Sequence, residues 1–241
     1  MKEVRYFYVP NASLAGELPE EEAKHAVRVL RLQCGDRILI VDGEGGLYES
    51  EVSMVSGKHC LYNIIEQHQC KREWRGNISL AIAPTKMMDR IEWMTEKATE
   101  IGFDEISFLD CKFSERKTLR TDRIERIVVS AMKQSHKAWK PVVNDMMSFR
   151  DFILSPRKGQ KFIAHCYDNV AKCDFYNEVS KMPLDEPVTI LVGPEGDFSI
   201  DEVNFAIEHD FISVTLGKSR LRTETAGLYA VMMANLAKRR I

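Results

Sequence analysis

The spacing of apolar and polar positions divides the chain into two parts that meet near residue 72. In the first part, Arg5–Val9 and the apolar run Ile38–Val41 predict strands. The turn Asp42–Gly46 then leads into the alternating segment Leu47–Val52. Two strand patterns joined by a glycine-rich turn indicate a β-hairpin.

One helix interrupts this β-rich part. It is predicted over Glu20–Leu32, with Ala23 and Leu30 on the same apolar face. A further strand is predicted at Cys60–Ile65. We therefore expect residues 1–72 to form a small β-barrel domain.

Strand and helix patterns alternate in the second part, after a polar connector at Lys71–Gly76. The expected strands are Ile78–Ala83, Glu105–Leu109, Phe162–His165, Val188–Val192 and Ile212–Leu216. The expected helices are Met87–Ile101, Asp122–His136, Ser199–His209 and Thr223–Lys238. Short apolar strands that alternate with helices are typical of a largely parallel sheet covered on both faces. Residues 73–241 are therefore expected to form an α/β domain.

Composition and charge narrow the class of protein only a little. The chain is 44% hydrophobic and 29% charged, which is ordinary for a globular protein, and its net charge of −2 does not point to nucleic acid. The start, Met1–Arg5, lacks the apolar core of a signal peptide, and the apolar stretch Thr225–Ala237 is too short to span a bilayer. The six cysteines include no Cys-x-x-Cys pair. We expect a cytoplasmic protein with no membrane contact, no disulfide and no metal site.

Two loops that follow predicted strands carry the candidate chemistry. The first, Leu191–Phe198, passes through Gly-Pro-Glu-Gly before a helix, and the second, Leu216–Ala226, also begins with a glycine after a strand. Ligands of open parallel sheets bind beyond the carboxyl ends of the strands, where glycines let backbone amides come close. Neither loop matches a P-loop or a dinucleotide fingerprint, so each alone could be an ordinary turn. Their equivalent positions favour one shared ligand site.

The chain resembles the ribosomal RNA small subunit methyltransferase E family, within the SPOUT class of methyltransferases. The resemblance covers nearly the whole chain, and the two loops are its most specific part. The segments that carry it are His25–Arg31 with Gly35 and Asp36, Lys86–Gly102, Phe113–Arg116, Gln134 with Ser135, Leu191–Gly196 and Leu216–Ala226. It implies a PUA-like, RNA-binding barrel at residues 1–72. It also implies a SPOUT domain with a trefoil knot at residues 73–241.

The resemblance also implies an activity, a cofactor and partners. The enzyme would methylate N3 of a uridine in 16S ribosomal RNA, free or in the small ribosomal subunit, with S-adenosylmethionine as methyl donor, and it would form a homodimer. Backbone at three strand ends would hold the bent cofactor. The implied cofactor contacts are His165, Leu191, Gly193, Glu195, Gly196, Leu216, Gly217, Leu221, Thr223 and Thr225.

Methyl transfer to uridine N3 requires alignment, loss of the N3 proton and stabilisation of the resulting negative charge. Arg222 is the candidate cation because it follows the second loop and its guanidinium is always charged. The alternative for Arg222 is a salt bridge to Glu224 or Glu195. Glu195 is a candidate base or orienting group, and its alternative is to cap the helix that begins near Ser199.

A basic segment provides candidate RNA contacts. Between Lys112 and Lys140 there are nine Lys or Arg against three acids. Such a stripe can neutralise phosphates, although a charge run is often only a solvated face. His136 and Trp139 could stack on a base. The candidate RNA contacts, which include three arginines of the first part, are Arg5, Arg28, Arg31, Arg116, Arg123, Arg126, Lys133 and Lys137.

Two other functions remain open on the sequence. A SPOUT enzyme that methylates ribose 2′-oxygens of tRNA or rRNA would share the two loops. It usually lacks the barrel and the Phe113–Arg116 element. A non-catalytic RNA-binding protein of ribosome assembly would share the basic segment but bind no cofactor.

Overall fold

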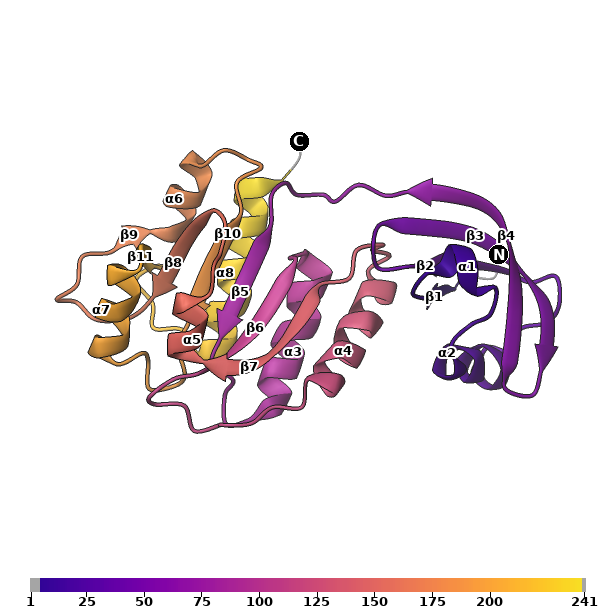
Figure 1. Cartoon of the computed structure of the whole chain (residues 1–241), viewed down its shortest axis with the longest axis horizontal. Coiled ribbons are helices and arrows are strands. Elements are labelled where there is room, and N and C mark those ends of the chain that lie inside the picture. Colours follow the sequence, from indigo (N-terminus) through magenta and orange to yellow (C-terminus); the bar gives the residue numbers. More distant parts are fainter. Residues whose placement is uncertain (1–4, 240–241) are drawn as a thin grey trace. The chain divides into compact units, whose positions relative to one another are not determined.

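The computed structural model describes residues 5–239. The chain forms two compact units (Figure 1). The first comprises Met1–Arg72 and Val129–Lys140, and the second comprises Glu73–Val128 and Pro141–Ile241. Among the described residues, every helix is too short or too polar to cross a bilayer.

The first unit is built on a four-stranded sheet in the order β1-β2-β3-β4. Its strands are β1 (Tyr6–Tyr8), β2 (Arg37–Val41), β3 (Gly46–Ser56) and β4 (His59–Gln69). The pair β1–β2 is parallel, and the pairs β2–β3 and β3–β4 are antiparallel. The predicted hairpin is present. Asp42 shapes its turn, because the Oδ1 atom accepts hydrogen bonds from the backbone N–H groups of Glu44 and Gly46.

The helix predicted over residues 20–32 is shorter than expected. After the short helix α1 (Ala12–Ala15), α2 (Glu20–Lys24) continues into a π-helical turn, η1 (His25–Val29). The N–H of Leu30 bonds to the carbonyl of His25, five residues back, which widens the helix and ends it. Ala23 and Ala26 are nevertheless fully buried against the sheet, as the apolar pattern requires.

Residues 129–140 complete the core of the first unit. Met132 and Ala138 are buried together with Val41. The indole N–H of Trp139 donates to the Cys70 carbonyl at 3.0 Å, and the Arg72 guanidinium lies 4.4 Å from the Trp139 ring centre. His136 stacks on Tyr6, with ring centres 4.4 Å apart. Both rings that were candidates for base stacking are therefore engaged within the unit.

The second unit contains a seven-stranded sheet in the order β7-β6-β5-β10-β8-β11-β9. Every neighbouring pair is parallel, which confirms the fold class predicted from the alternating pattern. The strands are β5 (Ile78–Ile82), β6 (Glu105–Asp110), β7 (Val142–Ser148), β8 (Gln160–Ala164), β9 (Cys173–Asp174), β10 (Val188–Val192) and β11 (Phe211–Thr215). The trefoil knot stays a prediction.

Helices cover both faces of this sheet (Figure 1). One core contains apolar residues of α3 (Met88–Ile101), α4 (Thr121–Gln134), α6 (Phe175–Lys181) and α8 (Thr223–Lys238). The other contains residues of α5 (Phe149–Leu154) and α7 (Ile200–Glu208). Alternate residues of β10 serve the two cores: Ile190 belongs to the first and Leu191 to the second. This double burial explains why the strands are apolar throughout.

Candidate functional site

Three neighbouring strands end at the same level of the sheet. Val192, the last residue of β10, pairs with Ala164, the last residue of β8, and Ala164 also pairs with Val214 of β11. The loops that follow these strands line one cavity of about 1290 Å³. A ligand of nucleoside size fits such a volume. The site therefore lies beyond the carboxyl ends of parallel strands, where open α/β sheets bind ligands.

Most of the expected cofactor contacts lie in the wall of this cavity. The ones that line it are His165, Gly193, Glu195, Leu216, Gly217, Leu221 and Thr223. The other three lie outside the lining. Leu191 is fully buried in the core beneath α5 and α7, Gly196 is exposed beside Phe113, and Thr225 is exposed on α8.

Asp197 ties two of the three loops together, and sequence reasoning missed it. Its Oδ2 atom accepts from the backbone N–H of Cys166 at 2.8 Å, in the loop after β8. Its own N–H donates to the Pro194 carbonyl at 2.9 Å, which closes a tight turn in the loop after β10. Asp197 has a φ of 65°, a conformation that Asp tolerates better than most residues. An Asp directly after Gly-Pro-Glu-Gly was the available signal.

Two glycines shape the cavity in different ways. A Cβ at Gly193 would lie 2.9 Å from the backbone nitrogen of Phe198, so only glycine lets this loop close on itself. Gly217 has a φ of 123°, and a Cβ there would meet no protein atom within 4 Å. The space beside Gly217 is therefore open to a ligand, which can approach the backbone closely.

His165 holds the loop after β8 rather than offering a free ring. The side chain is buried, and its Nδ1 atom accepts from the Tyr167 N–H at 3.2 Å. The proton must then lie on Nε2, which donates to the Ser213 hydroxyl oxygen at 3.1 Å. Burial lowers the pKa of His165, and so does nearby Lys172. The neutral imidazole thus joins the ends of β8 and β11.

Neither of the alternatives considered for Arg222 and Glu195 is present: Arg222 forms no salt bridge to Glu224 or Glu195, and Glu195 does not cap the following helix. Glu195 accepts a hydrogen bond from the Lys86 N–H at 2.9 Å and does not cap α7, which has its own capping box of Ser199 and Glu202. Glu224 faces Arg90, with 3.5 Å between Oε1 and Nη1. Arg222 is exposed at the start of α8 and forms no ion pair within the described part of the chain.

Comparison with known proteins places this site in a family. A model described as an RNA methyltransferase domain matches residues 72–235, and one described as an RNA methyltransferase PUA domain matches residues 18–65. The ribosomal RNA small subunit methyltransferase E of Bacillus subtilis is 30% identical over 235 residues, which span 92% of this chain and 88% of the relative. The chain belongs to the ribosomal RNA small subunit methyltransferase E family.

Solved structures agree with this assignment. A crystal structure titled "probable rRNA-methyltransferase from Porphyromonas gingivalis" aligns with a TM-score of 0.89 and 39% identity, over 98% of both chains. The methyltransferase E of Neisseria gonorrhoeae, solved with bound S-adenosylmethionine, aligns with a TM-score of 0.79 and 27% identity, over 95% of both chains. The resemblance seen in the sequence is confirmed, and the PUA-like character of the first unit with it.

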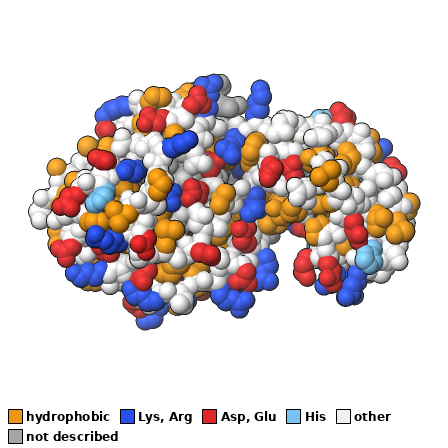
Figure 2. Space-filling view, in the orientation of Figure 1, with side chains coloured by type: hydrophobic (Ala, Val, Ile, Leu, Met, Phe, Trp, Pro, Cys, Tyr) orange, Lys and Arg blue, Asp and Glu red, His pale blue; other side chains and the backbone are white. Residues whose placement is uncertain are grey.

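The basic side chains of this family member differ in their exposure and in the contacts that they make within the chain. Arg28 and Arg31 are exposed in the first unit, as is Arg5. In the second unit, Arg116 donates to the Lys86 carbonyl at 2.7 Å and Arg123 pairs with Glu92 at 2.7 Å. Arg126 pairs with Asp122, Lys133 pairs with the half-buried Glu22 within the first unit, and Lys137 is half-buried. On the face shown in Figure 2, basic and acidic side chains are interspersed.

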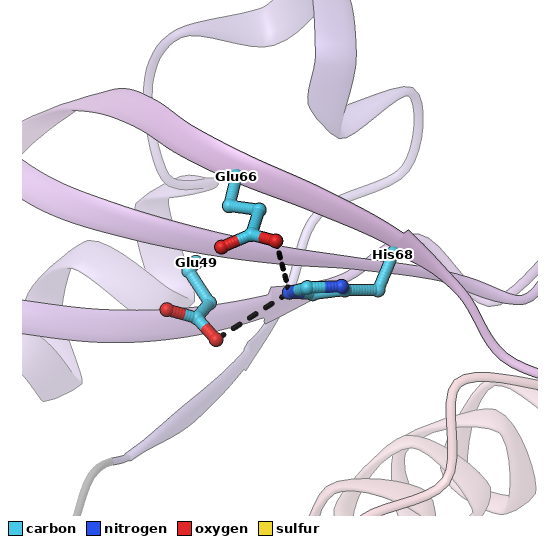
Figure 3. A group of neighbouring side chains, drawn as sticks. All are labelled: Glu49, Glu66 and His68. Carbon is cyan, nitrogen blue, oxygen red and sulfur yellow. Dashed lines mark ion pairs between the residues drawn. The ribbon is translucent and has the colours of Figure 1, made fainter.

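One group of side chains in the PUA-like unit has metal-ligating chemistry. Ligand atoms of Glu49, Glu66 and His68 lie within 4.8 Å of one another on the neighbouring strands β3 and β4 (Figure 3). The imidazole lies between the two carboxylates, with Nε2 3.4 Å from Glu49 and 3.7 Å from Glu66. Both carboxylates are exposed, and exposed acidic groups commonly gather without a metal ion. The sequence analysis expected no metal site, and the spacing of these three residues along the chain did not indicate that they would lie together.

Proposed function

We propose that this chain transfers a methyl group from S-adenosylmethionine to N3 of a uridine in 16S ribosomal RNA. The observation that carries the proposal is the single cavity formed by the loops after β10, β8 and β11 in a member of the methyltransferase E family. The PUA-like unit supports an RNA partner, either free 16S rRNA or the small ribosomal subunit. Such a substrate places the protein in the cytoplasm.

The cavity suits S-adenosylmethionine in both size and lining. Gly217 leaves open space against its backbone, and Leu216 and Leu221 supply apolar surface for an adenine ring. Gly193 and Glu195 form the opposite loop, which Asp197 holds to the loop after His165. The cofactor would be held by these residues, with Leu191, Gly196, Thr223 and Thr225 supporting the loops.

The chemistry requires little from the protein beyond alignment and charge stabilisation. A sulfonium supplies an activated methyl group, and the uracil N3 must lose its proton to attack it. In this proposal Arg222 stabilises the negative charge that spreads onto the uracil carbonyl oxygens, because it is exposed, cationic and in the wall of the cavity. Glu195 orients the loop after β10 through its hydrogen bond to the Lys86 N–H.

The candidate arginines and lysines would bind the RNA backbone. We assign this role to Arg5, Arg28 and Arg31 of the first unit. Along the basic segment we assign it to Arg116, Arg123, Arg126, Lys133 and Lys137. Those that are paired within the chain would have to exchange a carboxylate for a phosphate, so Arg28 and Arg31 are expected to contribute most.

Cofactor binding tests the proposal directly. Calorimetry should detect binding of S-adenosylmethionine. When the cofactor concentration is about a hundred times its Kd, the free energy of unfolding should rise by about 2.7 kcal/mol. ATP, which shares the adenosine, serves as the control and should have a much smaller effect. Neither heat nor a thermal shift at about millimolar cofactor would favour the non-catalytic RNA-binding alternative.

The position of methylation separates the enzymatic alternatives. 16S rRNA from a strain without the gene should lack one 3-methyluridine, as mass spectrometry of the digested RNA would show. Purified protein and S-adenosylmethionine should restore it. Loss of a ribose 2′-O-methyl group instead would identify the other class of SPOUT enzyme.

A homodimer is the second part of the proposal. Tyr229, Met232 and Leu236 recur at helical spacing on α8 and are each more than a third exposed, and Trp93 is exposed on α3, which packs against α8. An apolar stripe of this kind on a surface helix is typical of an interface. It also explains why α8 is apolar nearly all round.

Met232→Glu is expected to convert the dimer to a monomer, because it places a charge in the apolar stripe. Light scattering after gel filtration measures the mass. Leu154→Glu changes an apolar residue on α5 that is 53% exposed, against 38% for Met232; it is the control and should remain dimeric. A wild-type protein that elutes with the mass of one chain would refute this part of the proposal.

A further inference from the structure

Where α3 and α8 begin, the wall of the cavity contains a carboxylate with one oxygen that accepts no hydrogen bond within residues 5–239. Glu224 lies in the first turn of α8 and is 8% exposed. Its Oε1 atom is 3.5 Å from Nη1 of Arg90, in the first turn of α3. Its Oε2 atom is buried and finds no hydrogen-bond donor within residues 5–239. Of the buried polar atoms in this condition, it is the one that belongs to a residue lining the cavity.

A second glutamate shows what a purely structural pair looks like here. Glu92 lies on α3 and is also largely buried, and it contacts Arg123 through both carboxylate oxygens at 2.7 Å. Glu224 has only one long contact, and Arg90 itself is 41% exposed. A buried carboxylate oxygen without a donor is unfavourable. A ligand in the cavity that brings an N–H group to Oε2 would satisfy this oxygen.

Three of the charged groups that line the cavity lie at the starts of α3 and α8: Arg90, Glu224 and, two residues before Glu224, Arg222. Two donors and an acceptor are complementary to the imide edge of uracil, which presents a carbonyl, the N3–H and a second carbonyl. Enzymes that modify a flipped-out base commonly read this edge through hydrogen bonds. Cytosine has no hydrogen on N3, so a carboxylate at that point would repel it.

On the basis of the proposed function, we infer that Glu224 accepts the N3 proton of the target uracil, while Arg90 and Arg222 donate to its two carbonyl oxygens. The N3–H bond breaks, and its proton passes to Oε2 of Glu224. The electron pair left on N3 forms the bond to the methyl carbon. The carbon–sulfur bond breaks, and its electrons neutralise the sulfonium. Glu224 then returns the proton to solvent.

Glu224→Gln tests the assignment. It preserves the size of the side chain but cannot take up a proton. We expect the single-turnover rate of methylation of 16S rRNA, or of small subunits from a strain without the gene, to fall by about two orders of magnitude or more. The Kd for S-adenosylmethionine should stay within about twofold, since the carboxylate faces the base.

The pH profile separates a proton acceptor from a structural group. In the Gln variant the N3 proton must leave to solvent, so the rate should rise in proportion to hydroxide concentration. The deficit relative to wild type should then shrink at alkaline pH. A structural defect would leave a deficit that does not change with pH. Glu224→Asp, which keeps a carboxylate, should recover part of the rate.

Controls make each failure distinguishable. Glu208→Gln removes an exposed carboxylate at the end of α7, outside the cavity, and should behave as wild type. If wild-type protein neither binds the cofactor nor methylates rRNA, the proposed function fails. If wild type is active and a folded Glu224→Gln protein keeps its rate, only the Glu224 assignment fails. A variant that loses cofactor affinity instead would reassign Glu224 to the amino group of S-adenosylmethionine.

Discussion

Arg222→Ala is expected to lower the rate of methyl transfer by about two to three orders of magnitude while leaving the fold intact. The guanidinium is exposed, forms no ion pair within residues 5–239, and gives α8 no side-chain cap. Its removal therefore breaks no ion pair and no helix cap within residues 5–239. Its loss would raise the activation barrier of methyl transfer, because a hydrogen-bond donor that is already in place stabilises the negative charge that develops on the uracil oxygens.

The measurement is a single-turnover assay at saturating S-adenosylmethionine, with cofactor Kd and melting temperature recorded in parallel. Arg150→Ala is the control, and a small fall in its melting temperature is expected because the Arg150 guanidinium lies 4.5 Å from the Phe205 ring centre. It removes an exposed arginine from α5, on the opposite face of the sheet. Near-normal turnover of Arg222→Ala would remove Arg222 from the mechanism, and the charge would then be carried by Arg90 alone.

Strong apolar periodicity made most of the second unit predictable from sequence. β10 is apolar throughout and is buried on both faces, so its pattern and its environment agree. β7 and β9 escaped prediction for the opposite reason. β7 is a half-buried edge strand with polar Asn144 and Asp145, and β9 has only two residues, so neither carries an apolar run. The short helix α5 follows β7 directly and was missed with it.

The part of the site that could be predicted from the sequence is the backbone of its glycine-containing loops. The sequence could indicate the loops around Gly193 and Gly217, because a glycine directly after an apolar strand allows a tight turn or a close approach of the backbone to a ligand. It could not indicate that Glu224 would face Arg90 or that Asp197 would bond to Cys166. Those contacts join residues 134 and 31 positions apart, and only the packing of helices and the order of strands brings them together.

The open space beside Gly217 leads to the prediction with the clearest structural control. Gly217→Val should weaken S-adenosylmethionine binding by about a hundredfold or more. Two effects combine at this position. A β-branched residue is strained at a φ of 123°, which costs about 1–3 kcal/mol, and its side chain would occupy the cavity, where no protein atom stands within 4 Å of the Cβ. Calorimetry gives the Kd, and thermal unfolding gives the cost to stability.

Gly35→Val is the control that produces the backbone strain without filling the cavity. Gly35 also has a positive φ, 91°, and a Cβ there also meets nothing within 4 Å, but it lies in an exposed turn of the first unit and outside the cavity. The two variants should lose comparable stability, whereas only Gly217→Val should lose the cofactor. Equal affinities in both would mean that no ligand approaches Gly217. The cavity beyond β10, β8 and β11 would then have to bind S-adenosylmethionine on its other walls.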